Sequence, residues 1–238
     1  MRKRNLAAER IALREASIVI CNSRRTRDDV VERVGIEAHR AHVVYYGADP
    51  VKFSVVSPSG RADAKRELRL DPSRPLVGFV GALGDRRKGF DTLFEAWTAL
   101  CRLPNWDANL MVVGAGAEIP QWKRRAREAG LADRMTFAGY RFDMPAVFAA
   151  LDVLVHPARY EAYGLSVHEA LCRGVPAFVS AFVWRRGTLS DQSVRVAHFQ
   201  SRRTRRNCRS AHQVACGLRT SRMPNRSTLS TAARPLVG

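Results

Sequence analysis

The sequence predicts an α/β fold, a doubly wound parallel sheet of the Rossmann-like type, which we expect to be incomplete at its C-terminal end. Short apolar runs alternate with helical periodicity from residue 76 to residue 180. This alternation is typical of successive βαβ units, which place their strands in parallel. A glycine-bearing loop after the apolar run at 152–155 supports the same fold, because ligands of such sheets bind beyond the carboxyl ends of the strands.

The first 75 residues carry shorter signals. Their pattern predicts a helix at 5–15, a buried strand at 17–23, a helix from a cap at Asn22 or Ser23 to about Val34, and a strand at 42–46. Residues 54–75 are rich in Ser, Pro, Arg and Asp and predict a linker, with one short helical stretch at 64–68.

From residue 76 onward each predicted strand is followed by a predicted helix. In the first of these helices, Phe90, Leu93, Phe94 and Trp97 recur at the spacing of one helical face. The strands are expected at 76–80, 109–113, 135–138, 152–155 and 177–179. The helices are expected at 90–101, 119–129, 144–151 and 166–173.

Residues 181–238 depart from this pattern. They hold twelve arginines, no lysine and a single acid, Asp191, so eleven of the eighteen net positive charges lie there. No period of 2 or 3.6 is sustained. Two interpretations stay open: a disordered basic arm that binds nucleic acid or acidic lipid, and a shifted reading frame or decayed gene end. We favour the second, because acids and lysine vanish directly after a well-formed strand.

Composition narrows the class of protein. The five cysteines show no Cys-x-x-Cys pair and no zinc-like spacing with histidine, so we expect reduced thiols in a cytoplasmic protein. No run approaches the ~20 apolar residues of a membrane helix. The basic body leaves open a peripheral contact with anionic lipid at the inner face of the membrane. No Asp-x-Asp metal motif is present, and we expect neither a metal nor a cofactor.

Two glutamates flank the glycine of the loop after 152–155. Glu161 lies in the loop, and Glu169 lies in the helix that follows, with Tyr163, Gly164 and Leu165 between them. Amides at a helix N-terminus suit an anion such as phosphate. A loop carboxylate and a helix carboxylate on either side of such a turn can accept hydrogen bonds from two hydroxyl-bearing parts of one phosphate-linked ligand.

This spacing, followed by Gly174-Val175-Pro176, resembles the donor-site motif of the retaining nucleotide-sugar glycosyltransferases of family 4, which have the GT-B fold. The resemblance implies that Glu161 contacts the donor sugar, as the catalytic residue, and that Glu169 binds the ribose. It also implies that the amides of Gly164 and Leu165 face the diphosphate. A Glu-x7-Glu spacing alone is common, and its predicted context is what favours the functional interpretation.

The loop Gly81–Gly89 also follows a predicted strand and precedes a helix. The family places a Lys before the last glycine, which Lys88 matches, and an Arg after the first, where this chain has Ala82. Arg86 or Arg87 can substitute for that Arg. The resemblance therefore assigns Gly81, Lys88 and Arg87 to the donor diphosphate. The alternative is a solvent-exposed basic turn without a binding role.

Three further features are weaker. The turn Gly114-Ala115-Gly116 resembles a Gly-x-Gly turn of the family, and Tyr140 lies where the family binds the base. His156 and His168 flank the glutamate motif without partners at metal-ligand spacing. We interpret His156 as a strand-end histidine and not as a ligand.

The resemblance implies transfer of a glycosyl group, with retention, from a nucleotide diphosphate sugar to an unknown sugar, lipid or glycan acceptor. It divides the chain into a remnant of an acceptor domain at 1–53, a linker at 54–75, a donor-binding domain at 76–180 and an atypical tail at 181–238. The chain is expected to be a fragment. The alternatives are a nucleotide-sugar epimerase and a non-catalytic fragment that binds nucleotide or nucleic acid; nucleic-acid binding by the body is not expected.

Overall fold

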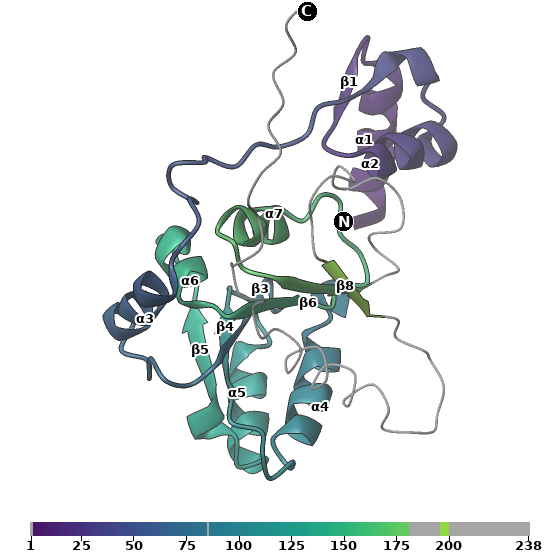
Figure 1. Ribbon diagram of the computed structural model, residues 1–238. Coiled ribbons are helices and arrows are strands. Elements are labelled where there is room, and N and C mark those ends of the chain that lie inside the picture. The colour runs from purple at the N-terminus through teal and green to yellow at the C-terminus, as the bar shows by residue number, and fades with distance from the viewer. Residues whose placement is uncertain (1, 85, 181–195, 200–238) are drawn as a thin grey trace, which may run out of the picture.

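The computed structural model describes residues 2–84, 86–180 and 196–199. Figure 1 shows a small N-terminal unit and a larger unit built on a six-stranded sheet, joined by a long extended segment. Within the described residues, no helix is long and apolar enough to cross a membrane.

The N-terminal unit consists of two helices and a two-stranded parallel sheet. Its elements are α1 (Arg2–Glu15), β1 (Val19–Cys21), α2 (Arg24–Asp29), a π-helical turn (Val30–Val34), a 3-10 turn (Ala38–Arg40) and β2 (Ala41–Val43). Ser23 caps α2, because its Oγ accepts the N–H of Thr26 at 3.1 Å, so the predicted cap is confirmed. The strand expected at 42–46 is shorter than predicted and begins one residue earlier.

The segment predicted as a linker contains a longer helix than expected. Helix α3 (Pro58–Glu67) begins six residues before the expected helical stretch, because Ser57 caps it and Pro58 occupies its first turn. Lys65 is buried and donates from Nζ to Asp152 Oδ2 at 2.7 Å, just before β6. Helix α3 therefore packs as part of the larger unit.

All six strands of the larger sheet run in parallel, in the order β5–β4–β3–β6–β7–β8. They are β3 (Leu76–Val80), β4 (Asn109–Val113), β5 (Met135–Gly139), β6 (Val153–His156), β7 (Ala177–Ser180) and β8 (Val196–Phe199). The chain leaves β3 in one direction and returns to place β6 on its other side. The predicted Rossmann-like fold is confirmed, and its topological switch point lies between β3 and β6.

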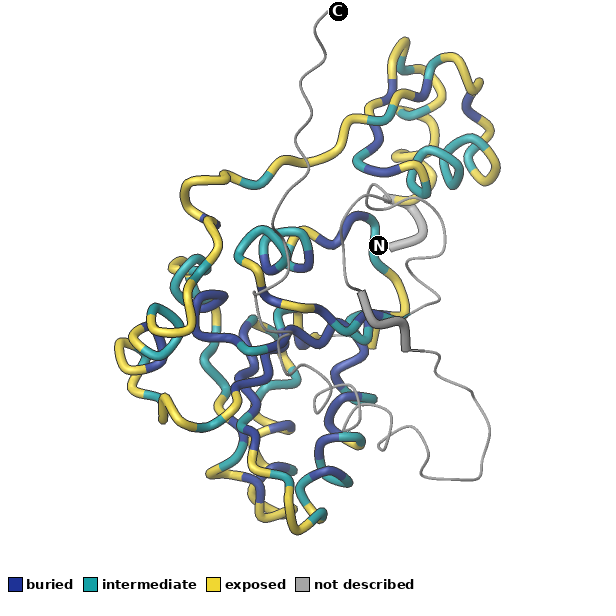
Figure 2. The backbone as a smooth tube through the Cα atoms, viewed as in Figure 1, coloured by how far each residue is buried: buried dark blue, intermediate teal, exposed yellow. Residues whose placement is uncertain are grey.

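Helices cover both faces of the sheet (Figure 1). On one face lie α4 (Phe90–Leu100) and α5 (Ile119–Glu128), and on the other lie α6 (Met144–Ala150) and α7 (Leu165–Cys172). Two short 3-10 turns, Arg86–Lys88 and Ala132–Arg134, complete the order. Figure 2 shows the strands buried between these layers. Trp97 and Phe79 mark the core on the α4 side, and Phe148 and Leu154 mark the core on the α7 side.

Strand β8 was not among the strands expected from the sequence. Its residues pair in parallel with β7, from Ala177 opposite Val196 to Ser180 opposite Phe199. An edge strand offers a row of unpaired backbone groups, and a four-residue segment can pair there without a long periodic pattern. The sheet thereby has a sixth strand. The rest of residues 181–238, with the disorder predicted for it, lies outside the described residues.

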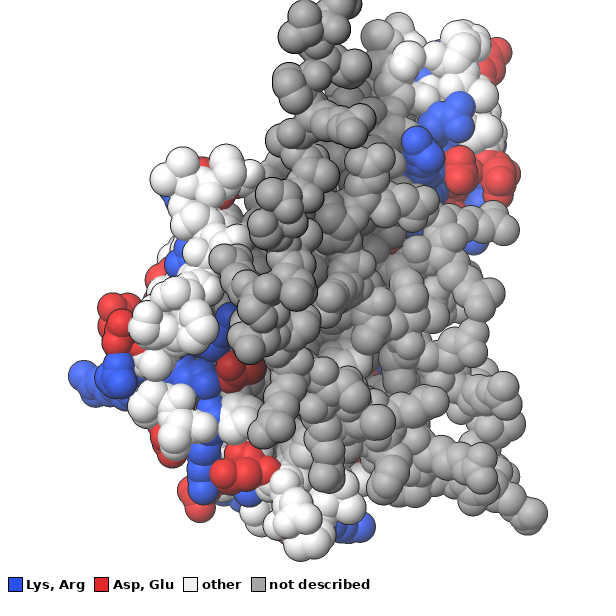
Figure 3. Space-filling view, viewed as in Figure 1, with Lys and Arg blue, Asp and Glu red and all other residues white. Residues whose placement is uncertain are grey.

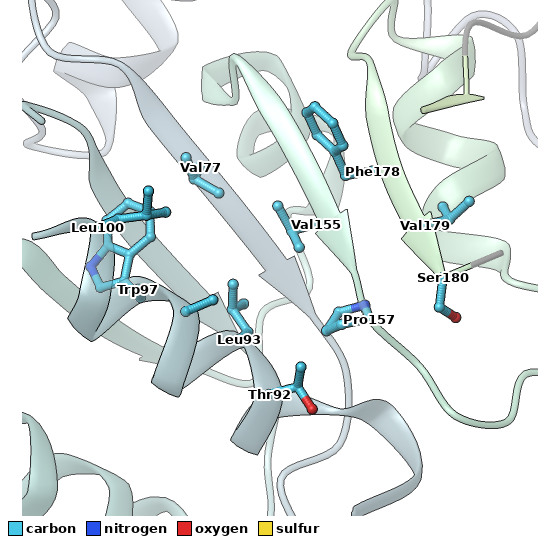
Figure 4. Close-up of a pocket in the computed structure, with 11 residues that line it drawn as sticks. Val77, Thr92, Leu93, Trp97, Leu100, Val155, Pro157, Phe178, Val179 and Ser180 are labelled. Carbon is cyan, nitrogen blue, oxygen red and sulfur yellow. The ribbon is translucent and has the colours of Figure 1, made fainter. Parts of the chain in front are cut away.

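An apolar pocket lies between α4 and the strands β6 and β7. Trp97, Leu93, Val155 and Phe178 point into it, and Thr92, Pro157 and Ser180 stand at the carboxyl ends of the strands (Figure 4). The pocket carries no charged side chain. It therefore belongs with the packing of the α4 face and not with the charged loops described below.

Charges of both signs alternate on the visible surface. Figure 3 shows blue and red side chains side by side near α3 and on the N-terminal unit. Ion pairs such as Arg66 with Asp63 and Arg33 with Asp29 account for part of this mixing. The described part of this face has no single-sign patch of the kind that attracts a polyanion.

Candidate functional site

Two loops meet at the switch point. One follows β3 and runs from Gly81 to Gly89, and the other follows β6 and runs from Pro157 to Gly164. Gly89 has φ +72°, and a Cβ there would lie 2.1 Å from the carbonyl oxygen of Pro157. Only glycine leaves room for the two loops to approach each other this closely.

Lys88 and Glu161 face each other across this junction. Lys88 Nζ donates to Glu161 Oε2 at 2.5 Å, although the residues are 73 positions apart in sequence. The buried ring of His156 lies beneath the pair, with Nε2 3.0 Å from the same oxygen. The sequence predicts that each of these residues lies in a loop or at a strand end, but it does not predict that Lys88 and His156 both contact Glu161.

These contacts set the charge of Glu161. Burial by itself raises the pKa of its carboxyl group, but hydrogen bonds from His156 and Lys88, together with the positive charge of Lys88, outweigh burial and lower the pKa to about 2. The group is an anion at neutral pH. A carboxylate accepts hydrogen bonds only, so Nε2 of His156 carries the proton in this contact.

A second contact joins the loops from outside. The Arg159 guanidinium donates to both Asp91 oxygens, at 2.6 and 3.0 Å, and to the Arg86 carbonyl at 2.7 Å. Burial raises the pKa of Asp91, but the hydrogen bonds and charge of Arg159 lower it below its usual value. The charge-assisted pair therefore anchors the β6 loop to the first turn of α4.

The two arginines that could replace the family Arg lie differently. Arg86 is exposed and pairs with Asp91, its Nε 3.3 Å from Oδ2. Arg87 is exposed, and its carbonyl accepts the N–H of Arg159 at 2.7 Å. Ala82 is exposed as well.

The Gly-x-Gly turn after β4 supports the β3 loop. A Cβ on Gly114 would lie 1.9 Å from the Gly81 carbonyl oxygen, and one on Gly116 would lie 2.1 Å from the Leu83 carbonyl carbon. The Gly81 amide donates to the Val113 carbonyl at 3.0 Å. That amide is used within the fold, so what Gly81 can offer a ligand is close approach and not an N–H.

The start of α7 lies directly after the β6 loop. Gly164 has φ +88° and occupies the N-cap, and Leu165 is exposed. The amides of Val167 and His168 donate to the Gly164 carbonyl at 2.9 and 3.0 Å. Amides of the first helical turn point outward along the axis and form an anion-binding position.

Glu169 contrasts with Glu161. It is half-buried one turn into α7, and burial raises the pKa of its carboxyl group. Among the described residues its side chain has neither a hydrogen bond nor a salt bridge. A half-buried carboxylate of this kind is stabilised by hydrogen-bond donors that reach it.

Tyr140 lies apart from this cluster. It follows Gly139 at the end of β5, is 67% exposed and packs edge-to-face on Phe142, with ring centroids 5.0 Å apart. Strand β5 is two positions from β3 in the sheet, about 10 Å at the usual strand spacing. The structure does not bring Tyr140 into contact with Lys88 or Glu161.

The β6 loop, from Pro157 to Gly164, also contacts the N-terminal unit. Ser23 Oγ donates to the Ala162 carbonyl at 2.6 Å, and the Tyr163 hydroxyl donates to the Tyr46 carbonyl at 2.6 Å. The hydroxyl oxygen of Tyr163 also lies 2.8 Å from Nδ1 of His168. Burial raises the pKa of Tyr163, so the phenol keeps its proton. His168 thus contacts Tyr163 of the β6 loop.

His156 is the residue that sequence interpretation undervalued. Its position at a strand end was predicted correctly, but its bond to Glu161 was not. The available signal was a histidine on the α7 side of the sheet, in step with Leu154, five residues before a loop glutamate. Within the described chain, no three His, Cys, Asp or Glu side chains gather as a metal site.

A Rossmann-like sheet with paired charged loops and an anion-binding helix start at its switch point is the architecture of a nucleotide-dependent α/β enzyme. Comparison with known families makes this specific. The family described as "Glycosyl transferases group 1" matches residues 74–192, which is half of the chain, and the chain belongs to it. "Glycosyltransferase Family 4" matches residues 1–52.

Curated relatives are glycosyltransferases. The chain is 36% identical over 139 residues to the lipopolysaccharide core biosynthesis mannosyltransferase LpsB of Rhizobium meliloti, with 56% of this chain and 38% of that protein covered. It is 34% identical over 177 residues to the 2-deoxystreptamine N-acetyl-D-glucosaminyltransferase of Streptomyces fradiae, with 71% and 40% covered. The chain thus spans less than half the length of these relatives.

Solved structures agree on the GT-B glycosyltransferase fold. The Anabaena protein HepE, solved in complex with UDP-glucose, superposes with a TM-score of 0.67 at 25% identity, covering 77% of this chain and 50% of HepE. Sucrose-phosphate synthase of Thermosynechococcus elongatus gives a TM-score of 0.65 at 30% identity, with 77% and 45% covered.

Proposed function

We propose that this chain is the donor-binding half of a retaining family 4 glycosyltransferase that uses a nucleotide diphosphate sugar. The observation that carries the proposal is the Lys88–Glu161 pair at the switch point of the sheet. It places an anion and a cation at the edge where such sheets bind nucleotides. The family match favours a glycosyltransferase over the epimerase and over a nucleic-acid-binding fragment.

Glu169 is the proposed ribose ligand. Its half-buried carboxylate lacks a protein partner among the described residues, and two neighbouring hydroxyls would supply the missing donors. Hydrogen bonds to a charged acceptor of this kind are worth about 1.5–3 kcal/mol. The raised pKa of Glu169 fits the same role, because bound donors would lower the cost of its charge.

The diphosphate is proposed to lie between Lys88 and the start of α7. A lysine ammonium has three N–H donors, and one of them is on Glu161. The others can reach phosphate oxygens, alongside the amides at Gly164 and Leu165. Arg87 is the nearby cation proposed to add to them, and Tyr140 is proposed to border the base. These groups would stabilise the diphosphate as it leaves with increasing negative charge.

Glu161 is proposed to contact the donor sugar. Glycosyl transfer proceeds through a transition state with positive charge near the anomeric carbon, and a fixed anion stabilises that charge. The pKa of about 2 keeps Glu161 ionised throughout the working range of pH. Retention of configuration is proposed from the family motif alone.

The acceptor is proposed to be a hydroxyl of a sugar, lipid or glycan. Residues 1–53 would be the last part of the acceptor domain, since residues 1–52 match a second glycosyltransferase family model that lies before the donor half on this chain. Ser23 and Tyr46 join this part to the β6 loop. We propose a cytoplasmic reaction, with the acceptor presented there.

Calorimetric titration of the full chain with UDP and UDP-glucose tests the proposal. We expect both to bind, and UDP-glucose should bind with higher affinity than UDP if Glu161 contacts the sugar. The variant Glu128→Ala, which removes an exposed glutamate of α5, is the matched control and should bind like the wild type. If no nucleoside diphosphate sugar binds at millimolar concentration, the proposed function is wrong.

A further inference from the structure

A buried histidine lies beneath the proposed sugar-binding glutamate. His156 ends β6 with 1% of its surface exposed, and strand alternation places it on the same side of the sheet as Leu154. Its Nε2 lies 3.0 Å from Glu161 Oε2. Its Nδ1 is also buried and has no hydrogen-bond partner among the described residues.

The hydrogen bonds at Glu161 converge on one oxygen. Lys88 Nζ and His156 Nε2 both contact Oε2, at 2.5 and 3.0 Å, and within the described chain neither reaches Oε1. An ionised carboxylate cannot donate, so the proton of this contact belongs to Nε2. Two donors on one oxygen fix the rotation of the carboxylate and leave the other oxygen for a ligand.

The two donors differ in rigidity. Lys88 stands on a four-carbon stem with a side chain that is 29% exposed, and it has further N–H groups to offer a phosphate. The His156 ring sits on a buried strand, registered with Val179 of β7. An apolar residue could fill the same space in the core without leaving a buried nitrogen unpaired, so the histidine costs stability that packing alone does not require.

We propose that His156 is a positioning residue, which holds Glu161 through its Nε2–H so that the Oε1 atom faces the donor sugar. This role rests on the proposed function, in which Glu161 contacts that sugar. Lys88 is then able to shift toward the diphosphate while the carboxylate keeps its orientation.

The first test needs no ligand. Long-range proton–nitrogen NMR of wild-type His156 should show the proton on Nε2 at neutral pH, and a neutral ring with its proton on Nδ1 alone would overturn the role. The carboxyl carbon of Glu161 is then titrated in two variants. A glutamine amide can take the place of Nε2, whereas an asparagine amide falls near Nδ1, out of reach of Glu161.

The two variants should separate. In His156→Asn the pKa of Glu161 should rise by about one unit, and in His156→Gln it should stay near the wild-type value. An unchanged Glu161 pKa in His156→Asn overturns the proposal. Circular dichroism confirms folding; should His156→Asn not fold, His156→Leu gives the same comparison, and the wild-type NMR result decides if neither does.

The second test compares UDP with UDP-glucose by calorimetry. His156→Asn should weaken UDP-glucose binding about tenfold, leave UDP binding unchanged, and add nothing in a Glu161→Ala background. If Glu161→Ala weakens UDP-glucose binding but His156→Asn does not, the positioning role is overturned and the proposed function survives. If the wild type binds no UDP-glucose, the proposed function falls, and the role of His156 with it.

Discussion

The guanidinium of Arg159 and the carboxylate of Asp91 form a two-point contact, with Nη1–Oδ1 at 2.6 Å and Nη2–Oδ2 at 3.0 Å. The contact crosses the switch point from the β6 loop to α4, 68 residues away in sequence. It lies on the outer side of the same junction that Lys88 and Glu161 close. The pair therefore adds to the Lys88–Glu161 contact in holding the β6 loop against the segment that carries Lys88.

Replacing Arg159 should weaken donor binding more than it weakens the fold. In Arg159→Lys a single ammonium replaces the planar fork, so one of the two bonds to Asp91 is lost. Because Arg159 is 48% exposed at its side chain, we expect a stability loss of only about 1 kcal/mol. UDP-glucose affinity should fall about fivefold by calorimetry, since the loop is less well held.

The control for this experiment is Arg124→Lys on α5. Arg124 also pairs with an acid, but through one 3.7 Å contact on an exposed helix face. Its replacement should change neither stability nor binding. If Arg159→Lys also changes neither stability nor binding, the positive charge of Arg159, and not its planar fork, is what matters.

Glu169 and Glu161 should divide the donor between them. Glu169→Ala should weaken UDP and UDP-glucose alike, by roughly 10- to 150-fold, because a bond of about 1.5–3 kcal/mol to the ribose is lost from both. Glu161→Ala should leave UDP binding nearly intact and affect only UDP-glucose. Calorimetry of the two variants with the two ligands decides, and an equal loss of UDP affinity in both variants would refute the division.

The two glutamates should also respond to pH with opposite signs. The pKa of Glu161 falls from 4.5 in the unfolded chain to about 2 in the fold, so its stabilising contribution is complete above pH 4.5 and is lost as the pH drops toward 2. The pKa of Glu169 is raised, so its contribution is present at low pH and is lost as the pH rises through the folded-state value.

Urea denaturation between pH 2 and 6 measures this difference. The free energy of unfolding of Glu161→Gln should vary less with pH than that of the wild type below pH 4.5. In the wild type, ionisation of Glu169 should lower the free energy of unfolding as the pH rises above 4.5, and Glu169→Gln should remove this decrease. Parallel curves for Glu161→Gln and the wild type would show that Lys88 and His156 do not hold the carboxylate in solution.

Arg69 should be replaceable with a gain in stability. It is the one non-glycine residue with positive φ in the described chain, at +57°, and it ends α3 where Leu70 N donates to the Lys65 carbonyl at 2.8 Å. Glycine adopts this conformation without strain, so Arg69→Gly should raise the free energy of unfolding by about 1 kcal/mol. Arg69→Ala keeps the strain and should be neutral. Calorimetric melting compares them, and a destabilised Arg69→Gly would show that the left-handed backbone is not strained.

Sequence patterns predicted the larger unit well because its signals are local. The strands from Leu76 onward and the helical stripe of Phe90, Leu93 and Trp97 are periodic within a few residues, and the structure confirms them. Strand β8 was missed, because four residues become a strand only when an edge is already there to receive them.

The candidate site was predictable in part for the same reason. Each loop was recognised from glycine, charge and position, and parallel topology implies that loops after β3 and β6 meet. The contacts within the site were not predictable, because the conformation of each loop decides whether Lys88 reaches Glu161. His156 shows this most clearly, since a strand-end histidine has the same sequence pattern whether or not a carboxylate lies above it.

The purified chain should bind a sugar nucleotide yet transfer almost no sugar. Transfer requires an acceptor hydroxyl held beside the anomeric carbon, and such positioning is worth about five or more powers of ten in rate. In the described part of the N-terminal unit the sheet has only β1 and β2, and Ile20 of β1 and Ile18 just before it are more than 60% exposed. The chain also spans less than half of its curated relatives, so we propose that the acceptor site needs more of the fold than residues 1–53.

Radiolabelled UDP-glucose with a panel of sugar and lipid acceptors measures this directly. We expect calorimetric binding of the donor, slow release of free glucose at most, and no labelled product above that of Glu161→Ala. The Glu161→Ala variant serves as the matched background, because it should bind UDP like the wild type. Transfer many times above this background would show that Ser23, Tyr46 and the short sheet beside them already form a working acceptor site against the loop of Glu161.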